Sequence, residues 1–109
     1  MVEIEKIGEE SFIPFDSKNI SKVPKVAGVI ELADLSREII YIDSSPDINK
    51  RLFELVESYD PCLEATRFFR IEINPSVEEG LLKAFHRYKE NHDNKTPRCN
   101  RIDPTRRIK

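Results

Sequence analysis

The stretch VAGVIELADLSREIIYID, residues 26–43, decides the fold of this 109-residue chain. It holds two apolar runs, 26–33 and 38–43, both rich in β-branched residues and therefore typical of strands. Only residues 34–37 separate the two runs. A connection this short forces antiparallel pairing, so the stretch predicts a β-hairpin.

A helix is predicted directly after the hairpin. Ser45 is a good N-cap residue, and Pro46 suits the first helical position. The apolar residues that follow recur at helical spacing. They are Ile48, Leu52, Leu55, Val56 and Tyr59. Pro61 is expected to end this helix.

A third strand and a second helix complete the pattern. Residues 66–73 alternate apolar and charged side chains, which is typical of a half-buried strand. Ser76 and Glu79 have the spacing of a capping box, which predicts the start of a helix. That helix fades in the polar stretch 90–95 and cannot pass Pro97.

This order of elements predicts a single small α+β domain, a three-stranded antiparallel sheet flanked by two or more helices. Residues 1–24 lack a sustained period and are expected to form an arm packed on the core. Residues 25–100 form the domain itself, and residues 101–109 form a basic C-terminal tail.

Composition bounds the function only loosely. The formal net charge is −2, so the whole chain exerts no strong attraction on nucleic acid. Its C-terminal part is basic, which suits phosphate contact but also a solvated, frayed terminus. The basic residues there are Lys95, Arg98, Arg101, Arg106, Arg107 and Lys109, against Asp103 alone.

The cysteines and the absence of an apolar span predict the compartment. Cys62 and Cys99 are far apart and outside any CxxC pair, so we expect reduced thiols rather than a zinc site. No apolar stretch approaches the ~20 residues of a membrane span, and the N-terminus is acidic. The protein is therefore expected to be cytoplasmic, with no membrane partner.

Several short motifs occur in the order found in GIY-YIG nucleases, and the chain resembles that family over about residues 26–100. The first strand carries GVI at 28–30, and the second carries YID at 41–43. Arg51 follows the second motif by ten residues, and Glu78 precedes a pair of leucines. The sequence PRCN at 97–100 is similar to the asparagine turn that closes the family domain.

The resemblance implies a metal-dependent endonuclease that cleaves phosphodiester bonds, with DNA as the expected nucleic acid. Tyr41 would act as base or orient water, Arg51 would clamp the phosphate, and Asn100 would organise the site. Glu78 would hold Mg²⁺ or Mn²⁺, with Asp43 as a second metal ligand. Tyr41 can act as a base only if positive charge lowers its pKa.

Two departures from the family pattern leave a second hypothesis open. Ile30 replaces the tyrosine of the first motif, and Asp43 replaces the glycine of the second. The alternative is a catalytically inactive module of the same fold that binds nucleic acid or a protein partner. Taken singly, Tyr41, Arg51 and Glu78 are also ordinary surface residues. His86 and His92 are expected at the surface.

Overall fold

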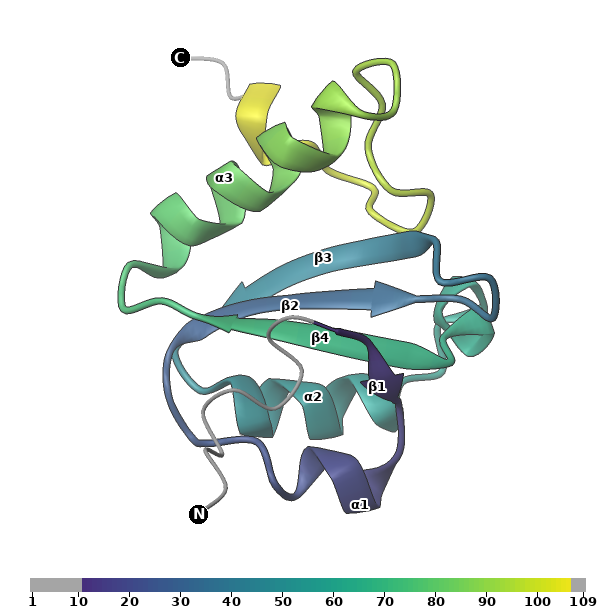
Figure 1. Cartoon of the computed structure of the whole chain (residues 1–109), viewed down its shortest axis with the longest axis vertical. Coiled ribbons are helices and arrows are strands. Elements are labelled where there is room, and N and C mark those ends of the chain that lie inside the picture. The colour runs from purple at the N-terminus through teal and green to yellow at the C-terminus, as the bar shows by residue number, and fades with distance from the viewer. Residues whose placement is uncertain (1–10, 107–109) are drawn as a thin grey trace.

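The computed structural model describes residues 11–106 as a sheet with helices on both faces (Figure 1). Its antiparallel strands are β1 (Ile13–Pro14), β2 (Gly28–Ala33), β3 (Ile39–Ser45) and β4 (Phe68–Ile73). Its α-helices are α1 (Ser17–Ile20), α2 (Ile48–Val56) and α3 (Val77–Glu90). Short 3-10 helices follow at η2 (Pro61–Ala65) and η3 (Pro104–Arg106). No helix within this described part has the length and apolar content needed to cross a bilayer.

The prediction of an α+β domain with an antiparallel sheet is confirmed, but the predicted number of strands is wrong. Among residues 11–106 the sheet has four strands, in the order β1-β4-β2-β3. The extra strand, β1, pairs Ile13 with Phe69 of β4. A two-residue strand containing Pro14 shows no periodicity, so only the contact with β4 reveals it.

The sheet separates two apolar layers, and alternation along β2 assigns its side chains to them. Ile30 and Leu32 belong to the layer shared with α1 and α2, where Leu52 is fully buried. Val29 belongs to the layer beneath α3, where Phe85 is buried. Figure 1 shows α1 and α2 on one side of the sheet and α3 on the other.

Strand β2 lies between β3 and β4 and is buried along its whole length. Because both faces of β2 are covered, residues 28–33 are almost all apolar instead of alternating between apolar and polar. The one charged member, Glu31, accepts a 2.7 Å hydrogen bond from the Arg70 guanidinium of β4. A side chain at Gly28 would collide with the backbone carbonyl of Glu72, so glycine is required for this close approach.

The predicted helix boundaries are correct only in part. Helix α2 starts after Asp47, whose carboxylate accepts a hydrogen bond from the Lys50 N–H, so the predicted cap at Ser45 is wrong. Ser45 is instead the last residue of β3. Tyr59 lies beyond the end of α2 and is 95% exposed, so it is not part of the apolar helix face. Ser76 does occupy the N-cap position of α3, but its side chain makes no capping bond.

The end of the predicted arm and the start of the predicted tail both pack on the rest of the chain. Ile20 and Val23 are buried in the layer beneath α2. On the other side, Lys89 of α3 donates 2.7 Å hydrogen bonds to Asp103 and to the Thr105 hydroxyl. Residues 1–10 of the arm and 107–109 of the tail lie outside the described residues.

The contact between Lys89 and Asp103 generates a pH-dependent prediction. Burial opposes the charge on Asp103, but hydrogen bonds from Lys89 and Thr105 outweigh burial and lower its pKa. A carboxyl with a lowered folded pKa stabilises the fold at neutral pH, and this contribution is lost as the pH falls through that pKa. We expect Asp103→Asn to reduce the free energy of unfolding by about 1–3 kcal/mol at neutral pH.

The difference between wild type and Asp103→Asn should shrink once the pH falls below about 4, where the unfolded carboxyl binds a proton while the folded carboxyl still carries its charge. Urea denaturation at neutral and acidic pH measures both values. The exposed Asp93→Asn is the matched control, since it removes the same charge elsewhere. An unchanged difference at the two pH values would contradict the assigned role of Asp103.

Candidate functional site

Tyr41, Asp43 and Arg51 meet on the face of the sheet that α2 covers. Tyr41 and Asp43 are two residues apart on β3, so their side chains share one face, and Arg51 is in the first turn of α2. The Arg51 Nε donates to Asp43 Oδ2 at 2.7 Å, and the Tyr41 hydroxyl donates to the same oxygen at 3.3 Å. The side chains of Tyr41, Asp43 and Arg51 are therefore brought together.

The electrostatics of this cluster hold the proton on Tyr41. Burial, followed by the negative charge of Asp43, raises the Tyr41 pKa above its ordinary value, and Arg51 offsets this only in part. A tyrosine that acts as a base needs its pKa lowered. In this arrangement Tyr41 is a hydrogen-bond donor at neutral pH.

Arg51 is committed to neighbouring carboxylates. Burial opposes its charge, but hydrogen bonds to Asp43 and then to Glu54 outweigh burial and raise the Arg51 pKa. Its Nη1 donates to Glu54 Oε1 at 3.0 Å, and its side chain is 35% exposed. The remaining guanidinium donors can reach a ligand only at the rim of the cluster.

Glu78 belongs to the other layer of the molecule. It is an exposed residue in the first turn of α3, the helix that packs on Val29 and Ile42. The bonds that join Tyr41, Asp43 and Arg51 are made by β3 and α2. Arg51 and Glu78 therefore project from helices on opposite faces of the sheet (Figure 1).

The residues described here do not fit the Mg²⁺ or Mn²⁺ site that the resemblance implies. Both oxygens of Asp43 are already used, since Oδ2 accepts from Arg51 and Tyr41 and Oδ1 accepts from the Ser44 N–H at 2.8 Å. A hard cation needs several free oxygen ligands in one place. Between residues 11 and 106 no group of three or more His, Cys, Asp or Glu side chains is placed to hold a metal ion.

Asn100 binds the backbone of β3 between Tyr41 and Asp43. Its side-chain Oδ1 accepts from the Ile42 N–H, and its Nδ2 donates to the Ile42 carbonyl, both at 2.9 Å. The side chain thus occupies the place of a neighbouring strand at this edge of the sheet. Through these bonds Asn100 holds the backbone that carries Tyr41 and Asp43.

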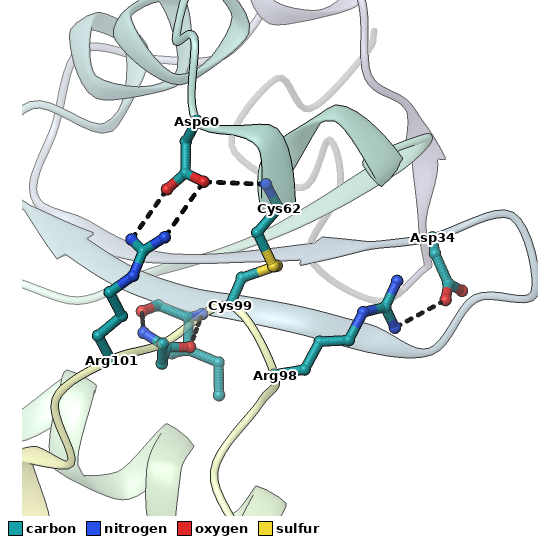
Figure 2. The surroundings of a disulfide bond; sticks show 8 residues. Asp34, Asp60, Cys62, Arg98, Cys99 and Arg101 are labelled. Carbon is teal, nitrogen blue, oxygen red and sulfur yellow. Dashed lines mark hydrogen bonds and ion pairs between the residues drawn. A yellow bond between two sulfur atoms is a disulfide. The ribbon is translucent and has the colours of Figure 1, made fainter.

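The prediction of reduced thiols is wrong, because Cys62 and Cys99 form a disulfide (Figure 2). The Cys99 N–H donates to the Ile40 carbonyl of β3 at 2.9 Å, so the disulfide joins η2, which carries Cys62, to the segment that lies on β3. A separation of 37 residues gives no sequence signal for this contact. Disulfides occur in oxidising compartments and in intracellular hyperthermophile proteins, so a cytoplasmic location stays a prediction.

Sequence reasoning missed two ion pairs between the basic segment 97–101 and the rest of the chain. Arg101 contacts Asp60 at 3.1 Å, and Arg98 contacts Asp34 at 3.3 Å (Figure 2). Hydrogen bonding to Arg101 lowers the Asp60 pKa. The sequence showed that this segment is basic, but it did not show which acidic residues its arginines would contact.

A shallow hollow of about 240 Å³ adjoins the cluster at this segment. Its lining joins the strand, η2 and the C-terminal segment. The residues are Tyr41, Asp60, Cys99, Asn100, Arg101 and Ile102. The hollow offers one hydroxyl and one guanidinium on a rim that also carries the exposed Ile102.

No protein-family model matches this sequence, and no curated protein matches it either.

The disulfide generates a stability prediction. A cross-link across this separation removes chain entropy from the unfolded state, so reduction should cost about 2–4 kcal/mol of unfolding free energy. Thermal unfolding with and without dithiothreitol measures the change as a lower Tm. The double variant Cys62→Ser with Cys99→Ser is the control, because dithiothreitol should leave its Tm unchanged. Two free thiols in the untreated protein would contradict the pairing.

Proposed function

We propose that the protein is a GIY-YIG-like module that binds nucleic acid along the outer edge of β3. The observation that carries the proposal is the placement of the basic segment 97–101. This segment lies along β3, where Arg98 and Arg101 stand on the same edge as the Tyr41 cluster. Cations gathered on one edge are the electrostatic footprint expected of a phosphate-binding surface.

The ion pairs of these arginines leave them available to phosphate. The side chains of Arg98 and Arg101 are 56% and 72% exposed. Exposed ion pairs contribute only about 0–1 kcal/mol to stability. Such a pair can orient a guanidinium, and a phosphate can still compete for its N–H donors. Each guanidinium carries five N–H donors, and those not facing Asp34 or Asp60 can bind a phosphate oxygen.

Binding is favoured over cleavage by the state of the remaining site residues. Ile30 removes one hydroxyl of the family pair, and the Tyr41 pKa is raised rather than lowered. Asp43 is held by Arg51, and Glu78 projects from the opposite layer. A metal-dependent endonuclease is the alternative that the same experiment tests.

Fluorescence anisotropy with labelled duplex, flapped and branched DNA, and with RNA, tests binding. We expect Arg98→Ala and Arg101→Ala each to weaken binding and to reduce the salt slope of log K by about 1, as loss of one phosphate contact predicts. The exposed Lys83→Ala on α3 is the matched control, because it removes the same charge from the other layer. Equal effects of all three variants would overturn the proposed surface.

Cleavage is tested on the same substrates with Mg²⁺ or Mn²⁺. We expect binding without strand breaks, in the wild type and in Arg51→Ala and Glu78→Gln alike. Metal-dependent nicking that disappears in both variants would establish the endonuclease instead. Neither binding nor nicking would leave the protein-partner hypothesis as the better one.

A further inference from the structure

A second hollow, of about 440 Å³, opens on the opposite side of the basic segment from the Tyr41 cluster. It lies between the start of β3 and the end of α3, and its lining includes Ile39, Tyr88, His92 and Arg98. This volume is within the range of small-ligand pockets. Arg98 also belongs to the surface proposed above, so this residue links the hollow to that surface.

A stacked pair of aromatic rings forms part of the lining of this hollow. The rings of Tyr88 and His92 are parallel within 2° and their centres are 3.7 Å apart. The His92 Nδ1 lies 2.7 Å from the Tyr88 carbonyl oxygen, which fixes the orientation of the imidazole. The His92 side chain keeps 36% of its surface exposed. A planar ligand would therefore meet an already oriented π-surface.

Charged groups of both signs line the hollow. Lys95 and Arg98 bring two cations and Glu38 and Asp93 bring two carboxylates, with Glu38 3.8 Å from the His92 Nε2. Arg98 lies next to the edge of β3, because the N–H of its neighbour Cys99 donates to the carbonyl of Ile40 on that strand. A stacking platform beside cations is the arrangement that binds single-stranded nucleic acid in general.

We propose that this hollow receives one unpaired nucleobase, stacked on the Tyr88–His92 pair, while Arg98 and Lys95 contact the adjoining phosphates. The ligand class is then single-stranded nucleic acid, or a duplex with an extruded base. This inference rests on the proposed function and specifies which form of nucleic acid the surface binds, namely one with an unpaired base. Stacking uses the face that every base possesses, so little sequence preference is expected.

The test compares two labelled twelve-residue strands, one with bases and one fully abasic, by fluorescence anisotropy on the full chain. We expect His92→Ala to weaken binding of the base-containing strand by about fivefold or more, the loss of one stacking contact. Binding of the abasic strand should not change. His92→Phe should retain tight binding, because it keeps an aromatic face.

The exposed His86→Ala on α3 is the matched control and should alter neither strand. A thermal unfolding curve for each variant shows whether it is folded. Equal loss on both strands, or no loss on either, overturns the stacking hollow while leaving the proposed nucleic-acid surface intact. A wild-type chain that binds neither strand nor any duplex overturns the proposed function as well.

Discussion

The pairing of residues 99–100 with β3 is the contact that positions the C-terminal segment of this structure and the surface built on it. An outer strand exposes unpaired N–H and C=O groups, and proteins usually cover them. Here the Cys99 backbone and the Asn100 side chain cover them, through hydrogen bonds to Ile40 and Ile42. The disulfide to η2 then holds the segment in place.

This one contact positions every cation that the proposed function uses. Because residues 97–101 follow the strand, Arg101 faces the hollow beside Tyr41, and Arg98 borders the hollow beside His92. The same backbone carries Tyr41 and Asp43 on the face toward α2. The basic segment thus borders both hollows, one beside Tyr41 and one beside His92.

The sheet also limits what chemistry this side can perform. It separates Arg51 on α2 from Glu78 on α3, and it leaves Asp43 as the partner of Arg51. The Arg51–Asp43 pair has no net charge, and Asp43 orients the Tyr41 hydroxyl. Such a pair is suited to binding a ligand rather than to holding a metal ion. A hard cation would have to displace that arginine before it could use the same carboxylate.

Local signals explain which parts of the fold were predictable. The hairpin, the third strand and α3 were predicted because the apolar residues of a strand or a helix recur at a fixed spacing along the sequence. Strand β1 was missed because two residues carry no period. The N-cap of α2 was misplaced because Ser45 and Asp47 are both good caps, and only the end of β3 decides between them.

The candidate site follows the same division. The sequence by itself determined that Tyr41 and Asp43 share a face of a strand, because alternate residues of a strand point the same way. Tertiary structure alone decided that Glu78 projects from the other layer, that Cys62 meets Cys99 and that the basic segment lies on β3. The physical reason is range: neighbours along the chain are set by backbone geometry, whereas these three facts depend on how separate elements pack.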